Sequence, residues 1–142
     1  MTSDQLLSLQ RIGSIDRVPF SKELLEKMLN VARSRLQDAL REDNSMETRF
    51  DCAYTAIRAV ADAALLKQGY RTSTSKPGHH QTTLQCLVHT LGVAPATVRV
   101  LDGLRKQRNL IDYDEELITD SLLMECLDQA NLLLGVASQR LK

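Results

Sequence analysis

An alanine-rich segment, residues 44 to 68, constrains the fold of this chain more than any other feature of its sequence. Its apolar residues recur with the 3.6-residue period of a helix, and six alanines lie between residues 53 and 64. Because the distance between packed helices depends on the side chains between them, such a slim helix lets neighbours approach closely on more than one side. The segment is therefore predicted to be the central helix of a bundle.

The same period predicts helices over residues 21–41, 80–91, 95–113 and from 119 onward. Ser21 is expected to cap the first of these helices, and Asn44 with Glu47 has the capping-box spacing before the central helix. Gly69 and Gly92 follow predicted helix ends, where glycine is common. No alternating pattern typical of a strand is found, so residues 20–142 are predicted to form an all-α, up-and-down bundle of four to five helices. Residues 1–19 form an N-terminal segment or short helix.

Composition narrows the class of protein. A length of 142 residues corresponds to about one domain. No apolar stretch approaches the roughly 18 residues of a membrane span, and the amino terminus has no signal-peptide pattern. We therefore expect a cytoplasmic protein with no membrane partner. Cys52, Cys86 and Cys126 fall within helical patterns and are expected to be reduced core thiols.

The formal net charge of zero hides an uneven distribution. Residues 1–111 hold sixteen Lys and Arg against eleven Asp and Glu, whereas residues 112–142 hold two against seven. Strong nonspecific binding to nucleic acid needs an excess of positive charge over a whole face of the protein. Any binding to phosphates is therefore expected to involve a local group of residues.

The predicted helix 95–113 carries the main candidate site. Its helical projection places Arg108 on the apolar face, with Arg105 and Asp112 beside it and Asn109 and Tyr113 on the same edge. A guanidinium that faces the core needs a partner or an opening to water. It can pair with Asp112, helped by Tyr113 or by a residue of the central helix such as Asp51. Alternatively, Arg105, Arg108 and Asn109 can form a phosphate or nucleotide pocket that Asp112 orients.

Two other groups of polar residues leave a structural and a functional interpretation open. Asp51, Tyr54 and Arg58 share one helical edge, as in a solvated face, an ion pair between helices or a ligand site. His79 and His80 precede the third bundle helix, and His80 can cap it or face the arginines of helix 95–113. No complete metal-ligand set and no glycine-rich phosphate loop is seen, so no metal and no cofactor is predicted.

Over about residues 22 to 140, the chain resembles the HEPN superfamily of small helical proteins. The resemblance is most specific at the Tyr54-containing segment RFDCAYTAIRAVADAALLKQGY and at Arg108-Asn109 within LRKQRNLIDYD. Many members are dimeric RNA-cleaving toxins or defence nucleases, often encoded beside a nucleotidyltransferase partner. Others bind RNA or nucleotides without catalysis. The resemblance implies a HEPN-like bundle, a homodimer and a place in a toxin–antitoxin or defence system.

The catalytic motif of that family is Arg, four to six residues, then His. Counted from Arg108, those places hold Tyr113, Asp114 and Glu115. The tyrosine pKa lies roughly 3.5 units above that of histidine, so Tyr113 would need about 5 kcal/mol more to act as a base near neutrality. His80 is the other candidate for the missing group.

These observations predict a noncatalytic RNA- or nucleotide-binding homodimer. One alternative is a neutralising or helper subunit that presents the acidic segment with Glu115 and Glu116 to a protein partner. A further alternative is a divergent, metal-independent ribonuclease that uses Arg108 with His80 or Tyr113.

Overall fold

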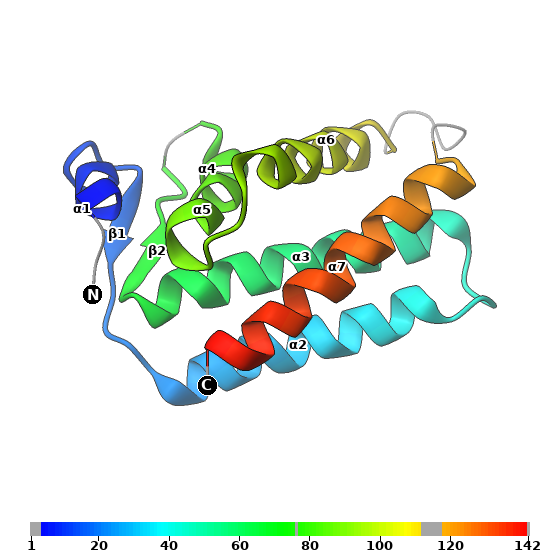
Figure 1. Cartoon of the computed structure of the whole chain (residues 1–142), viewed down its shortest axis with the longest axis horizontal. Helices are drawn as coiled ribbons and strands as arrows, with labels where there is room; N and C mark the ends of the chain where they lie inside the picture. Colours follow the sequence, from blue (N-terminus) through cyan, green and yellow to red (C-terminus); the bar gives the residue numbers. More distant parts are fainter. Residues whose placement is uncertain (1–3, 76, 112–117, 142) are drawn as a thin grey trace.

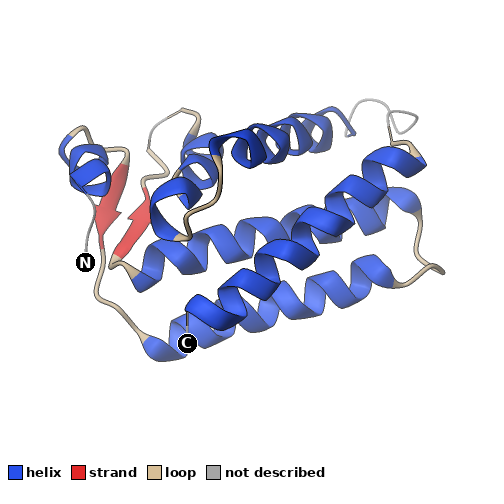
Figure 2. Cartoon of the chain, in the orientation of Figure 1, coloured by secondary structure: helices blue, strands red, loops and turns tan. Residues whose placement is uncertain are grey.

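A computed structural model describes residues 4–75, 77–111 and 118–141. The described chain is mostly helical, with one small antiparallel sheet (Figures 1 and 2). The elements in chain order are α1 (Asp4–Arg11), β1 (Ile15–Arg17), α2 (Lys22–Leu40), α3 (Met46–Lys67), β2 (Tyr70–Thr72), α4 (His79–Gln85), α5 (Leu87–Thr90), α6 (Pro95–Ile111) and α7 (Asp120–Arg140).

Helix α3 occupies the centre of the molecule. It contacts α2, α7, β2, α4, α5 and α6, and Figure 1 shows it between α2 on one side and α4 to α6 on the other. Most of its alanines are buried: Ala53, Ala56, Ala61, Ala63 and Ala64. The predicted role of the alanine-rich segment as the central helix is therefore confirmed.

Local capping explains where the long helices begin. Ser21 and Thr119 accept hydrogen bonds from the backbone N–H groups of Leu24 and Leu122, as expected of N-caps. The predicted cap at Asn44 is wrong by one residue, because Ser45 accepts from the Thr48 N–H. The Asn44 side chain instead donates to the Asp38 carbonyl oxygen at 2.9 Å, so it satisfies an acceptor at the end of α2.

The sheet contradicts the expectation that the chain has no strands. Strand β1 pairs with β2 in the register Ile15 to Thr72, Asp16 to Arg71 and Arg17 to Tyr70. Each strand has three residues, which is too short for an alternating apolar pattern to stand out. Gly69 ends α3 with a φ of 86°, a left-handed conformation that turns the chain into β2. The N-terminal segment is thereby attached to the end of α3.

The third bundle helix, predicted over residues 80–91, is divided into α4 and α5. The division falls at Cys86, where the His89 N–H donates to the Cys86 carbonyl oxygen three residues before it, as in a 3₁₀ turn. Helix α6 is described as far as Ile111, so its predicted extension to residue 113 lies outside the described residues.

The three cysteines are buried and form no disulfide, which confirms the expectation of core thiols. Burial raises the pKa of Cys86 to about 11 and that of Cys126, with a further contribution from Glu125, to about 12. Both are therefore thiols at neutral pH. None of the described helices combines the length and the apolar character needed to cross a bilayer.

Candidate functional site

The candidate site forms where α3, α4 and α6 pack against one another. Successive turns of α3 carry Tyr54, Arg58 and Asp62 on one face, because these residues are four positions apart. Helix α6 contributes Arg108, and the start of α4 contributes His80. Neighbouring turns of one helix and the ends of two others thus bring together polar side chains that lie far apart in the sequence.

The structure corrects the predicted burial of Arg108. Its side chain is 40% exposed and its Nε donates to Asp51 Oδ1 at 2.8 Å. Among the side chains of α6 whose burial is described, Leu104, one turn before Arg108, is the last that is buried. The sequence named Asp51 only as an additional partner in an Arg108–Asp112 pair, and the structure shows Asp51 in contact with Arg108. Since both side chains are largely exposed, this pair contributes at most about 1 kcal/mol to stability.

The remaining residues of the predicted ligand set are only partly gathered at the site. Arg105 Nε donates to Asp102 Oδ1 at 2.7 Å, and the two side chains are 18% and 17% exposed. Lys106 also approaches Asp102, at 3.6 Å. Asn109 is exposed. Sequence reasoning missed this cluster, although the spacing of Asp102 to Arg105 and Lys106, three and four residues, could have indicated it.

The other two predicted ligand-binding residues, Asp112 and Tyr113, lie outside the described residues. Their predicted roles in orienting a ligand, and the predicted ion pair between Arg108 and Asp112, stay predictions.

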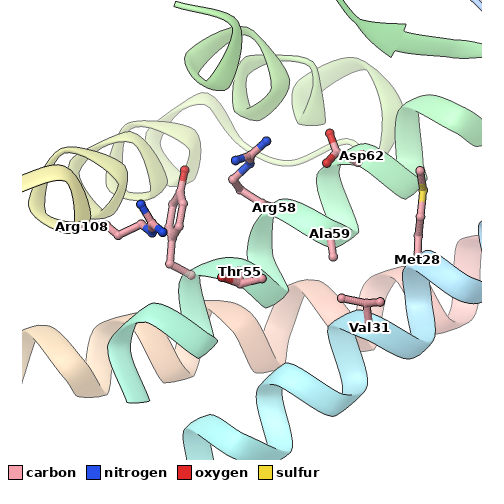
Figure 3. Close-up of a pocket in the computed structure, with 8 residues that line it drawn as sticks. Met28, Val31, Thr55, Arg58, Ala59, Asp62 and Arg108 are labelled. Carbon is pink, nitrogen blue, oxygen red and sulfur yellow. The ribbon is translucent and has the colours of Figure 1, made fainter. Parts of the chain in front are cut away.

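A cavity of about 300 Å³ adjoins Arg108. It is partly open to solvent and is lined by side chains of α2, α3 and α6, and Figure 3 shows Arg58 and Asp62 extending from α3 and Arg108 from α6. The lining residues are Met28, Val31, Tyr54, Thr55, Arg58, Ala59, Asp62 and Arg108.

Three buried polar atoms in the described part of the chain have no hydrogen-bond partner there: Tyr54 Oη, Arg58 Nε and His80 Nδ1. Tyr54 as a whole is 3% exposed. Buried polar groups are paired in the great majority of cases, and an unpaired one costs about 1–3 kcal/mol. Two of these three groups, Tyr54 and Arg58, line the cavity. Among the described residues, therefore, two donor groups without a partner lie at this cavity.

The charges of the site set the protonation of its members. Burial raises the pKa of Tyr54 to about 12, although Arg58, Arg105 and Arg108 oppose the shift. Burial also lowers the pKa of His80 to about 4, and Arg58, His79 and the two α6 arginines lower it further. At neutral pH the site therefore presents a neutral phenol, a neutral imidazole and cationic guanidinium groups.

The charges of Arg58, Arg105 and Arg108 all lower the pKa of His80. The N-cap of α4 is Gly78, without a side-chain hydrogen bond. That His80 faces the arginines of α6 stays a prediction.

Sequence reasoning placed the centre of the site on α6 and gave less weight to α3. The row Asp51, Tyr54, Arg58 divides in the structure: Asp51 pairs with Arg108 across the helices, whereas Tyr54 and Arg58 line the cavity. Asp62 extends the same row by one turn and was missed, although the helical period would have found it. Burial raises the pKa of Asp62, and Arg58 and His79 oppose this shift.

Within the described ranges, no group of three or more His, Cys, Asp or Glu side chains is arranged to hold a metal ion. No family model matches the chain, and no curated protein or solved structure matches it.

Proposed function

We propose that this protein binds a phosphate-bearing ligand, an RNA or a nucleotide, in the cavity between α2, α3 and α6. Arg58 and Arg108 contact the phosphate oxygens, and the Tyr54 hydroxyl donates a further hydrogen bond. The observation that carries the proposal is that Arg58 Nε and Tyr54 Oη are buried at this cavity without a partner among the described residues. Two guanidinium groups and a hydroxyl can donate to an anion that has several acceptor oxygens, and the Asp62 carboxyl group lines the same cavity beside them.

The protonation of the site favours binding over cleavage. A general acid or base works best when its pKa lies near the operating pH. With pKa values of about 4 and about 12, His80 and Tyr54 lie far from neutrality on opposite sides. We therefore propose a noncatalytic role, and RNA incubated with the protein and a chelator should stay intact. Cleavage that is lost in His80→Gln would instead support the divergent ribonuclease.

Membership of the HEPN superfamily, the homodimer, the nucleotidyltransferase partner and the toxin–antitoxin or defence context stay predictions from resemblance. Analytical ultracentrifugation checks the homodimer directly. The alternative of a neutralising or helper subunit depends on Glu115 and Glu116, which lie outside the described residues.

Calorimetric titration of the wild type with 5′-nucleotides and short RNAs at low salt tests the binding proposal. Arg58→Gln and Arg108→Gln should each raise Kd at least about tenfold, because hydrogen bonds to charged groups contribute about 1.5–3 kcal/mol. The matched control is Arg41→Gln, which removes an exposed arginine paired with Asp43 on another part of the surface. Its Kd should equal that of the wild type.

Tyr54→Phe separates ligand binding from folding. Removing a buried hydroxyl that has no partner in the described chain should leave the free energy of unfolding unchanged or raise it by about 1 kcal/mol. The same change should weaken ligand binding several-fold. The proposal is wrong if the wild type binds no phosphate-bearing ligand, or if Arg58→Gln and Arg108→Gln bind as tightly as the wild type.

A further inference from the structure

A second cavity of about 510 Å³ adjoins the first. Both cavities are lined by Met28, Arg58 and Asp62, so the two spaces meet along one face of α3. The second extends from there to β2 and the start of α4. A ligand whose phosphate lies at Arg58 in the first cavity therefore has room to continue into the second.

The spacing of side chains on α3 sets the scale of such a ligand. Arg58 and Asp62 are four residues apart, which places their Cα atoms about 6 Å apart along the helix axis. In a nucleotide a single sugar separates the phosphate from the base, and this is a comparable span. Asp62 is thus placed to meet a base when Arg58 holds the adjoining phosphate.

Asp62 supplies a carboxylate to the lining of the second cavity. Its carboxylate makes no hydrogen bond or ion pair with another side chain in the described chain, and burial raises its pKa while Arg58 and His79 oppose the shift. An ionised carboxylate accepts hydrogen bonds and donates none. The group that meets it must therefore supply N–H or O–H donors.

Two threonine hydroxyls that line the second cavity, those of Thr72 and Thr83, are engaged within the protein, and Thr74 and Arg71 line it as well. Thr72 Oγ1 and Thr83 Oγ1 are 2.7 Å apart, and Thr83 Oγ1 also donates to the His79 carbonyl oxygen at 2.9 Å. On α2 and the end of α3, Leu24, Met28 and Leu66 supply an apolar wall to the same cavity. An apolar wall combined with an available carboxylate suits a flat heterocycle that carries N–H donors on its edge.

We infer that the ligand of the proposed site contains a guanine nucleotide, with its phosphate at Arg58 and Arg108 and its base against Asp62. Guanine presents two adjacent N–H donors, at N1 and N2, to the two carboxylate oxygens. Adenine and cytosine present an amino group beside an acceptor nitrogen, and uracil presents one N–H between two acceptors, so each of these also turns an acceptor toward the carboxylate. This inference rests on the proposed phosphate-binding function.

Calorimetric titrations of the full chain with GMP, AMP and UMP test the base preference. A well-placed pair of hydrogen bonds discriminates between bases by a factor of roughly 5 to 150, so GMP should bind at least about fivefold more tightly than AMP or UMP. Asp62→Asn should lower the GMP affinity to the AMP level and should not lower the AMP affinity. Asp16→Asn, at an exposed carboxylate on β1, is the matched control and should keep the preference.

Two further comparisons complete the test. The first distinguishes a free guanine nucleotide from a guanine within RNA, and the second distinguishes failure of the guanine inference from failure of the proposed function. A five-nucleotide RNA with a central guanine, compared with oligouridine of the same length, tells whether a guanine within RNA is preferred or GMP alone. If GMP, AMP and UMP bind with equal affinities that depend on Arg58, and if Asp62→Asn leaves these affinities unchanged, the guanine inference is wrong and the proposed function stands. If the wild type binds no nucleotide and no RNA, both are wrong.

Discussion

Tyr54, Arg58 and His80 each bury a polar atom without a partner in the described chain. At about 1–3 kcal/mol for each such group, this is a sizeable fraction of the roughly 5–15 kcal/mol by which domains are stable. A ligand that supplies acceptors to Tyr54 and Arg58 would remove part of this penalty. Ligand binding and stability are therefore coupled at these residues.

His80 predicts a pH dependence of stability. In the unfolded chain a histidine has a pKa of about 6.5, whereas in the fold the pKa of His80 is about 4 because of burial and the nearby Arg58, His79, Arg105 and Arg108. Between these values the unfolded state binds more protons than the folded state, so this residue lowers stability progressively as the pH falls from about 6.5 to about 4.

Urea unfolding across this pH range checks the prediction in three proteins. His80→Gln should lose stability less steeply than the wild type, because glutamine does not titrate and the other ionisable groups are shared. His89→Gln, at an exposed histidine, should follow the wild type. Parallel curves for His80→Gln and the wild type would show that the imidazole is not shielded from protonation.

At the scale of the helices, short sequence signals located most of the boundaries. Ser21 and Gly69 act where they were predicted to act, because caps depend on contacts within three or four residues. The helix predicted from residue 119 begins at Asp120, with Thr119 as its cap. The cap of α3 differs, since Asn44 and Ser45 are both good N-cap residues and their choice depends on a partner in α2. The Asn44 side chain donates to the Asp38 carbonyl oxygen, and Ser45 caps α3 in its place.

Ser45→Ala tests this assignment. Loss of the hydrogen bond from the Thr48 N–H, 3.1 Å long, should lower the free energy of unfolding by about 1 kcal/mol. Ser45→Asp should retain most of the stability, because aspartate also caps helices. Ser34→Ala in the exposed middle of α2 is the control and should be neutral or slightly stabilising. Denaturant titration measures all three, and an unchanged Ser45→Ala would contradict the cap.

At the scale of the whole molecule, packing converges on α3. The helix touches all the major elements around it, and its alanines let them approach closely. A separate contact joins the end of α7 to the end of α5, because Arg140 Nη1 donates a hydrogen bond to the Leu91 carbonyl oxygen at 2.7 Å. The site therefore lies on the most constrained helix of the fold, which suits a preformed binding cavity.

Ala61→Leu tests the role of the small side chains. Ala61 is 1% exposed, so a larger group has to displace its neighbours, and the free energy of unfolding should fall by about 1–3 kcal/mol. Ala96→Leu, at an exposed position early in α6, should change stability by less than about 0.5 kcal/mol. Thermal unfolding compares the two variants. Equal stability of both would mean that the bundle has space around α3.

The sequence alone determined the helices, their approximate ends and the central position of the alanine-rich segment. These features follow from periodicity and from contacts between residues a few positions apart, so a single sequence contains the signal. The tertiary structure decided which polar side chains meet. Arg108 reaches Asp51 across 57 positions, β1 pairs with β2 across a similar interval, and Tyr54 and the Nε atom of Arg58 are buried on the helix against which α4 and α6 pack. Such contacts depend on how whole helices pack, which no local pattern records.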